Sequence, residues 1–475
     1  MTDQSESTGR WAEVFGPRYA TVTLILCLGV ALLAFNVFLT STALPTAVQE
    51  LNGVALISWA LTLFLVFAIM GGAGAALLKQ LLGARVALLS AAAVFMAGSL
   101  VCAGASNMET VLIGRILQGL GEGVVAAICF ALIPELFPSR LVPKVFGMQA
   151  VVWAVAAFGG PLGAGILTEF ISWRAAFLVS VPLAIIFAAM VWRVVPNSKG
   201  APQDNADFPG VRLLMVGSGI MLVALASLSL PLQAAGLLVG AMALLSGMVV
   251  LDRRARTRLM PPDAFWPGSV VGSGLWVVLL MPVAGAMSAV YLVLLLQQLW
   301  GYGPTLAGAT AAVLSVAWSL SAIAVANVRR IETRRALIIS GPMLLGVGLL
   351  AVLAGLLNDQ VALVVAGQLS VGAGFGMANG YLSLTLMEAA RSGERDRVSA
   401  MVPTTQSAGN AIGAALAGVA ANLAGYAQAV SVTAIEQAII PVFVLAASMA
   451  ALGFVAAVRM TRLMGASPQS AAVTP

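Results

Sequence analysis

One acidic residue lies in the middle of a long apolar stretch of this chain. Glu122 stands within Gly-Leu-Gly-Glu-Gly, inside a run over residues 109–132 that is long enough to cross a hydrocarbon layer. An ionisable side chain at that depth is costly and generally faces a cavity or a polar partner. The chemistry that a carboxyl group offers in such a place is the binding and release of a proton.

Two further polar residues share a helical face with Glu122. Arg115 precedes it by seven residues, which is almost two turns and about 10 Å along a helix axis. Gln118 lies between them, three residues after Arg115 and four before Glu122. A direct ion pair over about 10 Å would be strained, so we expect Gln118 or water to connect the two charges.

Two interpretations of these three residues stay open. In the first, Glu122 binds a proton, Arg115 tunes its proton affinity and Gln118 connects them. In the second, they form a fixed structural network between helices. The first interpretation requires water and a dissolved guest to reach the carboxyl group, in a passage where two halves of the molecule meet.

Other polar and aromatic side chains inside apolar runs are candidates for lining a substrate cavity. Each one alone is more often a helix-packing contact than a ligand. Together, several amides and aromatic rings with a single internal acid suit an amphipathic organic molecule better than an inorganic ion. The candidates are Asn36, Thr40, Trp153, Tyr291, Gln297, Gln368, Asn379 and Gln406.

The composition excludes most soluble and catalytic classes. The 475 residues are 60% hydrophobic and 9% charged, whereas roughly a quarter of residues are charged in soluble domains. Histidine is absent, the three cysteines lack metal-ligand spacing, and no Gly-Lys-Ser phosphate loop occurs. We therefore expect no metal, no cofactor and no enzymatic activity. The net charge of +6 is spread over loops facing anionic lipid, so nucleic acid is not an expected partner.

The apolar runs and the basic residues predict an all-α, polytopic membrane protein. Of the 24 Lys and Arg, all but Arg115 and Arg174 occur in alternate connections and near the two ends. Because basic loops stay on the cytoplasmic side, both termini are expected there. About fourteen runs are long enough to span; they cover approximately 19–44, 55–78, 84–105, 109–132, 146–167, 174–195, 210–229, 233–251, 269–298, 304–327, 336–356, 360–387, 397–424 and 437–459.

The spans are expected to form two six-helix bundles with a two-helix hairpin inserted between them. Small residues at intervals of four, which let helices approach closely, recur in corresponding spans, as at Gly119 and Gly123 and again at Gly372 and Gly376. Two similar bundles that rock around a midplane site are a transporter design. The expected segments are a cytoplasmic N-terminus 1–18, a bundle 19–195, a linker with the hairpin 196–268, a bundle 269–459 and a cytoplasmic tail 460–475. Within 196–268, the stretches 196–209 and 252–268 are expected to be linkers on either side of the hairpin.

Two motifs resemble those of the major facilitator superfamily. The run from Arg115 to Gly121 resembles its Arg-x-x-Gln-Gly-x-Gly motif, which is associated with proton coupling. The glycine spacing of its antiporter motif is matched by Gly147, Ala156, Gly160-Pro161 and Ala164-Gly165, with Ala at two of the glycine positions. The expected two-helix hairpin narrows the resemblance to the fourteen-span drug:proton antiporter branch, and the resemblance covers nearly the whole chain.

The resemblance also implies roles for residues in packing and conformational change. Gly160 and Pro161 would shape a tight helix contact that limits leak, and Gly147 belongs to the same motif. Gly83 and Arg85 match the family's loop after the second span. These five residues are expected to act in conformational change and helix packing.

The chain departs from the family pattern at two positions. Asn36 stands where many members carry a membrane-embedded Asp, and an amide cannot titrate. Gln80 replaces the Asp of the loop after the second span, which normally helps to latch the inward gate. We therefore expect charge-based gating to be weaker here, and Glu122 to take over as the proton site if coupling exists.

The expected function is alternating-access transport of a small organic molecule, with proton-coupled export of the multidrug type as the main hypothesis. The alternative is uptake or facilitated diffusion of a metabolite or vitamin-like compound. A third interpretation, a membrane sensor or integral-membrane enzyme, would need an added soluble domain or a cluster of His, Asp or Glu near the membrane face, and the sequence indicates neither. The expected partners are protons, lipid and the substrate, and the expected form is a monomer in a bacterial plasma (inner) membrane.

Overall fold

The computed structural model describes residues 11–51, 57–197, 209–226, 229, 231–256, 258–302, 304–391, 393–426 and 429–466. These residues form helices joined by turns and irregular connections, and they contain no strand. The helices are α1 (Trp11–Val14), α2 (Ala20–Glu50), α3 (Ile57–Leu82), α4 (Ala84–Ala103), α5 (Met108–Leu136), α6 (Val142–Phe170), α7 (Trp173–Leu178), α8 (Ser180–Val194), α9 (Gly210–Ala226), α10 (Pro231–Arg254), α11 (Val270–Trp300), α12 (Pro304–Val325), α13 (Ile331–Leu357), α14 (Val361–Ala389), α15 (Arg395–Leu423) and α16 (Val432–Ala466).

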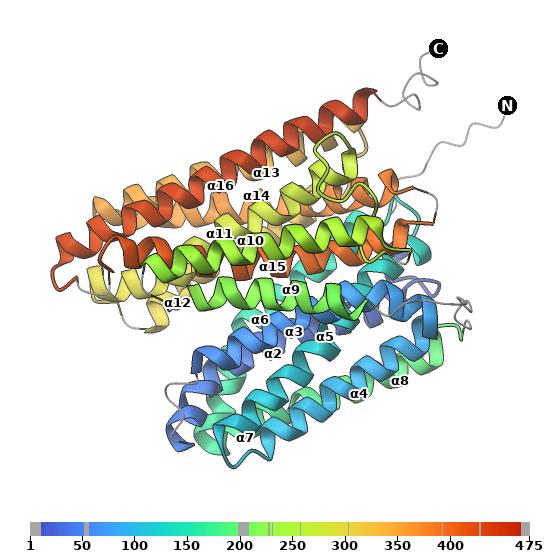
Figure 1. Ribbon diagram of the computed structural model, residues 1–475, viewed down its shortest axis with the longest axis horizontal. Coiled ribbons are helices and arrows are strands. Elements are labelled where there is room, and N and C mark those ends of the chain that lie inside the picture. The colour runs from blue at the N-terminus through green and yellow to red at the C-terminus, as the bar shows by residue number, and fades with distance from the viewer. Residues whose placement is uncertain are drawn as a thin grey trace.

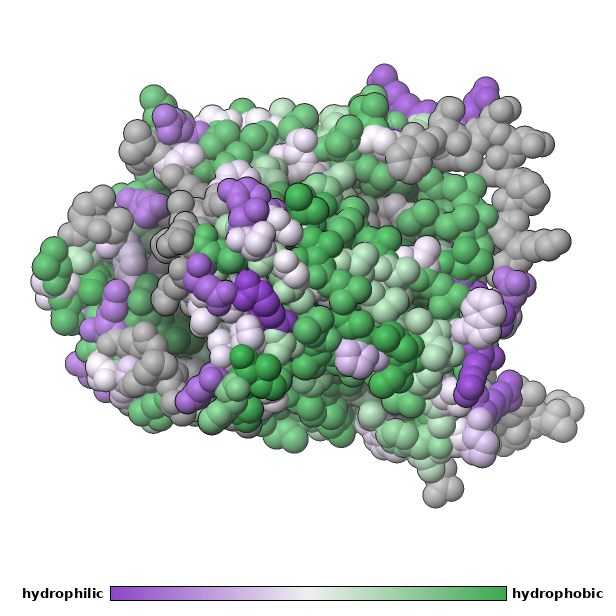
Figure 2. All heavy atoms as spheres, turned by 90° about the horizontal axis from the view of Figure 1, so that it is seen from below, coloured by the Kyte–Doolittle hydropathy of each residue, from purple (hydrophilic) through white to green (hydrophobic). Residues whose placement is uncertain are grey.

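Much of the fold is built from membrane-spanning helices. In the described ranges, 11 helical segments are long and apolar enough to cross a bilayer. The helices α6, α9 and α15 fall outside that set; α15 carries Thr, Gln and Asn side chains along its length and packs against other helices. Figure 2 shows apolar surface over the middle of the molecule and hydrophilic residues mainly toward its two ends.

The helices pack in two groups that meet along a few of their members. The helices from α2 to α8 pack mainly against one another, as do those from α11 to α16. The groups touch where α15 lies against α3 and α5, and where α12 and α14 lie against α6. The paired helices α9 and α10 lie across the junction, with α9 against both α3 and α15 (Figure 1).

One end of the molecule collects most of the basic residues, and we call it the basic end. It holds the α3–α4, α5–α6, α10–α11, α12–α13 and α14–α15 connections and lies at the right in Figure 1, with α1 and the end of α16. The contacts between the two groups gather toward this end. Lys79 pairs with Asp396, the Lys144 ammonium donates to the Ala326 carbonyl, and the Ser319 hydroxyl donates to the Ala150 carbonyl.

Three segment boundaries differ from the sequence-based expectation or lie beyond it. Most of the expected linker 196–209 lies outside the described residues. The second linker, 252–268, folds back against α10, because Asp252 accepts hydrogen bonds from the backbone of Leu259 and Met260. The last helix continues to Ala466, past the expected end at 459, and the rest of the tail lies outside the described residues.

Glycines on α5 allow neighbouring helix backbones to come very close. A Cβ built on Gly119 would lie 2.3 Å from the Phe64 carbonyl oxygen of α3, and one on Gly123 would lie 1.9 Å from that of Ala68. On the opposite face, a Cβ on Gly121 would lie 2.5 Å from the Ala91 carbonyl oxygen of α4. The small-residue row predicted from sequence, Gly119 and Gly123, thus forms the contact with α3. Gly121 forms the contact with α4, and the two contacts fix the position of Glu122 between them.

We expect Gly123→Ala to lower the free energy of unfolding by about 1–3 kcal/mol, because the added methyl group must push α3 away from α5. The matched control is Gly165→Ala on α6, where a Cβ would meet nothing within 4 Å. The control should leave stability unchanged or raise it slightly, since Ala favours a helix by about 1 kcal/mol over Gly. Thermal unfolding in detergent compares the two, and equal melting temperatures would contradict the prediction.

Candidate functional site

A buried polar network joins α2 and α5 at mid-span. The Asn36 side-chain amide donates to Oε2 of Glu122 at 3.2 Å. Its carbonyl oxygen, Oδ1, accepts from the Arg115 guanidinium at 3.4 Å and from the Thr40 hydroxyl at 3.3 Å. Asn36 therefore bridges the carboxyl group and the guanidinium, with a donor for one and an acceptor for the other.

The Arg115 guanidinium makes further contacts with three helices. It donates to Oε1 of Gln118 at 2.8 Å, to the Thr40 hydroxyl at 3.3 Å and to the Ala60 carbonyl of α3 at 3.2 Å. The guanidinium carbon also lies 4.0 Å from the centre of the Phe64 ring, a cation–π geometry. These contacts hold a fully buried charge in place among neutral partners.

Gln118 bonds to Arg115 and to α4 and not to Glu122, which differs from one sequence-based expectation. Its amide donates to the Ser99 hydroxyl of α4 at 2.9 Å, and Ser99 in turn donates to the Phe95 carbonyl. The connection between Arg115 and Glu122 thus runs through Asn36 and not through Gln118. The spacing within one helix could not reveal this, because the bridging amide comes from α2.

The network is closed to solvent in the conformation described. Glu122 is 2% exposed, Asn36 1%, and Arg115 and Gln118 0%. Among the described residues, Oε1 of Glu122 and one terminal nitrogen of Arg115 have no hydrogen-bond partner. The access to water that the proton-binding interpretation requires is therefore absent in this conformation, and it would have to come from a different one.

A second pair of polar side chains lies in the other group of helices. The Gln406 amide of α15 donates to Oδ1 of Asn379 on α14 at 2.8 Å, and both residues are partly exposed. On the neighbouring helices, the Trp318 ring of α12 stacks on the Phe375 ring of α14, with centroids 4.8 Å apart. The structure thus brings two of the predicted cavity residues into direct contact.

The remaining cavity candidates do not converge on these groups. Trp153 on α6 is 36% exposed and meets the Phe38 ring edge to face. Tyr291 on α11 packs against Tyr426, away from the basic end. Gln368 is buried on α14. The side chain of Gln297 lies outside the described set.

The predicted packing residues occupy close contacts and turns. A Cβ on Gly160 would lie 2.6 Å from the Phe38 Cβ of α2, so the α2–α6 contact is tight there, while the side chain of Pro161 is outside the described set. Gly147 lies against Trp11 of α1. Gly83 has a φ of 79°, which favours glycine, and forms the α3–α4 turn.

Arg85 ties two helix ends together just after that turn. Its Nε donates to the Val195 carbonyl at 2.5 Å, and the guanidinium lies over the Trp192 ring. The residue therefore fastens the start of α4 to the end of α8 at the basic end. This contact lies within one group of helices.

A charge contact between the two groups lies one residue before Gln80. The Lys79 ammonium of α3 forms ion pairs with Glu135 of α5 and, at 3.0 Å, with Asp396 of α15. The lysine side chain is 9% exposed. Weaker charge gating therefore stays a prediction: Gln80 stands in place of the family's Asp, and the neighbouring Lys79 makes a charged contact between the two groups. Its acidic partners lie about 56 and 317 residues away along the chain, so spacing offered no signal.

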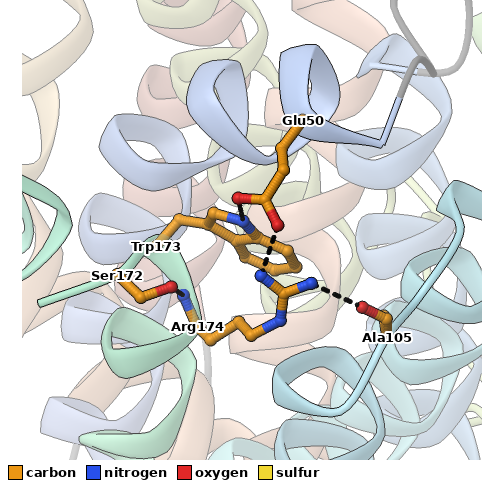
Figure 3. A network of polar contacts seen from close by, with 5 residues as sticks. All are labelled: Glu50, Ala105, Ser172, Trp173 and Arg174. Atoms are coloured by element: carbon orange, nitrogen blue, oxygen red, sulfur yellow. Dashed lines mark hydrogen bonds and ion pairs between the residues drawn. The ribbon is translucent and has the colours of Figure 1, made fainter.

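The other exception to the charge pattern, Arg174, forms a network at the end opposite to the basic end. Its guanidinium donates to Glu50 at 2.6 Å and to the Ala105 carbonyl at 3.0 Å, and the Trp173 indole donates to Glu50 at 2.8 Å (Figure 3). Ser172 caps the short helix α7 that carries both residues. The position of Arg174 away from the basic end is thus explained by its ion pair with Glu50.

We expect this network to make stability depend on acidic pH. Hydrogen bonds from Arg174 and then Trp173 lower the pKa of Glu50, which lies ten residues beyond the apolar span Ala20–Thr40. A lowered pKa in the folded state stabilises the fold above the unfolded-state value of about 4.3, and this contribution disappears as pH falls through the folded-state pKa. Glu50→Gln should flatten the decline of the melting temperature between about pH 6 and pH 3. The exposed Glu169→Gln should keep the wild-type decline, and a Glu50→Gln profile that matches wild type would refute the expectation.

Comparisons with known proteins agree on one class. A profile described as Major Facilitator Superfamily matches residues 26–414. A protein of Mycobacterium tuberculosis described as a probable multidrug-efflux transporter is 31% identical over 438 residues, which cover 89% of this chain and 92% of that protein. The multidrug transporter protein MdtP of Bacillus subtilis is 29% identical over 184 residues, covering 39% of this chain and 34% of MdtP.

Solved structures share the fold at low sequence identity. The human organic anion transporter MFSD10 superposes with a TM-score of 0.68 at 15% identity, covering 93% of this chain and all of that one. The proton:xylose symporter XylE superposes with a TM-score of 0.60 at 16% identity, covering 90% of this chain and 94% of XylE.

Proposed function

Since this chain belongs to the major facilitator superfamily, we propose that it is a proton-coupled exporter of small organic molecules, of the multidrug type. As a member it is a multi-pass membrane transporter and not an enzyme. The observation that carries the coupling proposal is the Glu122–Asn36–Arg115 bridge between α2 and α5. The named efflux relatives support the class of substrate.

The proposed architecture is fourteen spans arranged as six, two and six. The bundles are 19–195 and 269–459, with 196–268 as linker and hairpin and with 1–18 and 460–475 as the ends. We place the protein in the plasma (inner) membrane as a monomer, with the basic end and both termini in the cytoplasm. The contacts between the two groups would then gather at the cytoplasmic side, and on that basis we propose that this conformation faces outward.

Proton exchange at Glu122 requires the network to open during the transport cycle. Protonation changes the carboxyl group from a charged acceptor into a neutral group that can donate, and so changes its hydrogen bond with Asn36. Because Asn36 lies on α2, this change passes from α5 to α2. It also affects the bond that Asn36 accepts from Arg115. We propose that α2 moves relative to α5 as the halves rock, which admits water to the carboxyl group.

The proposed substrate contacts come from neutral groups. Asn379 and Gln406 offer amide donors and acceptors, while Trp318 offers an aromatic ring. No acidic side chain takes part in the pairs described between these residues. Such a surface suits an amphipathic organic molecule that is recognised by shape and stacking.

Transport in inside-out vesicles tests the proposal. We expect a fluorescent lipophilic amine to accumulate when the vesicle interior is acidified, and to leak out when an uncoupler collapses the gradient. Vesicles without the protein supply the background. Equal accumulation of the amine with and without the proton gradient would refute proton coupling.

Facilitated diffusion or uptake of a metabolite is the second candidate, favoured by the neutral Asn36 and by the closed network around Glu122. Intact cells separate the two hypotheses. An uncoupler raises the internal substrate level when an exporter is at work and lowers it for a proton-driven importer. A carrier that only equilibrates the substrate would show neither change.

The Lys79 contact is proposed to latch the cytoplasmic gate. We expect Lys79→Gln or Asp396→Asn to favour the inward-facing state about fivefold, the effect of one partly exposed ion pair worth about 1 kcal/mol. The measurement is the rate at which a membrane-impermeant maleimide labels Ala150→Cys from the cytoplasmic side, because the Ser319 contact covers that position. The native cysteines are buried and provide a low background.

The control for the latch removes an exposed charge that lacks this contact. Arg330→Gln, in the α12–α13 connection, should leave the labelling rate unchanged. The double variant Lys79→Gln/Asp396→Asn should not exceed either single variant by much, since both remove the same interaction. Fully additive increases in the labelling rate would contradict a shared latch.

A further inference from the structure

A largely apolar pocket of about 450 Å³ lies beside the hairpin. Its walls come from α3, α9, α10, α11 and α15 and from the linker residues 259–265, and we call it the hairpin pocket. Its polar lining residues are Ser246, Thr404 and Thr405, and none of its lining residues is charged. The pocket shares no residue with the Glu122 network or with the Asn379–Gln406 pair.

The linker is folded so that it forms one wall of this pocket. Asp252 is buried at the end of α10, where its Oδ1 pairs with the Arg212 guanidinium of α9 at 2.5 Å. Its two oxygens also accept from the backbone N–H groups of Leu259 and Met260 at 2.8 and 2.9 Å. The carboxylate therefore turns the chain back and holds both side chains against the cavity.

An aromatic pair completes the wall formed by the linker and α11. The Phe265 and Trp276 rings meet edge to face at 5.4 Å, and the Trp276 indole donates to the Phe265 carbonyl at 3.0 Å. Phe265 has a φ of 58°, which is unfavourable for a bulky residue and is held here by that bond. The linker is thus kept in a costly conformation in which Phe265 lines the pocket.

Arginines lie next to this apolar cavity, on the same face of α10. Val250 lines the pocket and is 49% exposed. Arg253 and Arg254 follow it by three and four residues, so they lie one turn closer to the basic end on the same helix face. Arg256 is also exposed, and Arg253 is held beside the linker by donating to the Ala264 carbonyl.

We propose that the hairpin pocket binds an anionic phospholipid, with an acyl chain in the cavity and the phosphate among Arg253, Arg254 and Arg256. The apolar lining matches the chain, and the arginines match the negative headgroup at the depth where a bilayer places it. A neutral lipid would satisfy only the cavity, and a free phosphate only the arginines. The arrangement therefore selects for both parts in one molecule.

The pocket touches both groups of helices, which gives its occupant a role in the transport cycle. Ile69 and Ala73 of α3 line one side, and Thr404 and Ala408 of α15 line another. These two helices pack against each other where the groups meet. A bound chain would therefore contact both sides of the moving junction, and its affinity would differ between the two states.

Native mass spectrometry of the purified full chain tests the proposal. Phosphatidylglycerol is titrated against phosphatidylcholine with identical acyl chains, and we expect the anionic lipid to be retained preferentially. Arg254→Gln/Arg256→Gln should weaken phosphatidylglycerol binding about 30-fold, since each arginine near the anionic surface contributes roughly fivefold. Both positions are exposed, so the variant should fold normally.

The matched control removes two exposed arginines elsewhere at the basic end. Arg329→Gln/Arg330→Gln has the same net charge and should bind phosphatidylglycerol as wild type does. Equal losses in both double variants, or no preference over phosphatidylcholine, would overturn the proposal. Glycerol 3-phosphate, which has the headgroup chemistry without the chain, should not compete; efficient competition would overturn the role of the cavity. This binding measurement does not depend on transport activity.

Discussion

Glu122→Gln is expected to abolish proton movement driven by substrate in proteoliposomes, down to the rate of protein-free vesicles. Gln is nearly the same size and can still accept from Asn36, but it cannot bind or release a proton in the physiological range. The fold should therefore persist while coupling is lost. Internal pH, read with a trapped dye after substrate addition, is the measurement.

The control for this experiment lies on the same helix. Glu109→Gln changes an exposed acid in the first turn of α5 and should leave proton flux at the wild-type rate. Substrate exchange without a gradient should continue in Glu122→Gln, because substrate contacts are proposed to lie on other helices. Proton flux equal in wild type and Glu122→Gln would remove Glu122 as the coupling residue and leave the fixed structural network as the interpretation.

Arg115→Lys is expected to lower the free energy of unfolding by about 3 kcal/mol. The guanidinium donates hydrogen bonds to Gln118, to Thr40 and to the Ala60 carbonyl. It also lies over the Phe64 ring. An ammonium group keeps the charge but cannot reproduce this geometry, so buried acceptors lose their donors. The measurement is the melting temperature, or unfolding in mixed detergent.

A chemically identical change at the surface provides the comparison. Arg330→Lys precedes α13 at an exposed position and should change stability by less than about 0.5 kcal/mol. If Arg115→Lys were as stable as Arg330→Lys, the guanidinium contacts would not be what holds α2, α3 and α5 together. Measuring Arg115→Lys with Glu122→Gln in a double-mutant cycle would then give the coupling that passes through Asn36.

Several features of the fold could be predicted from sequence because they depend on local composition. Long apolar runs report the membrane spans directly, since the bilayer sets their length. The row of Gly119 and Gly123 on α5 could likewise be read from its interval of four, and the structure shows it against α3. Arg115 and Glu122 could be selected because a charge inside an apolar run is conspicuous.

Partners that come from other helices could not be predicted in this way. The Asn36 bridge and the Lys79–Asp396 contact join residues 86 and 317 positions apart, and no periodicity relates them. The hairpin pocket was also absent from the sequence argument, because its walls come from five helices and a folded linker. Asp252, which folds that linker, resembles an ordinary loop acid until its backbone partners are seen.

The sequence by itself determined the membrane class, the family resemblance and which charged residues lie inside apolar helices. The length of an apolar run and the position of its flanking charges determine how a segment lies in the bilayer, whichever helices pack beside it. Only the tertiary structure decided what each polar group touches: Asn36 between the charges, Lys79 across the junction, and a closed carboxyl group in place of an open one. The reason is physical. In lipid, a polar side chain is stabilised by hydrogen bonds to whichever helix packs against it, and packing is a property of the assembled fold.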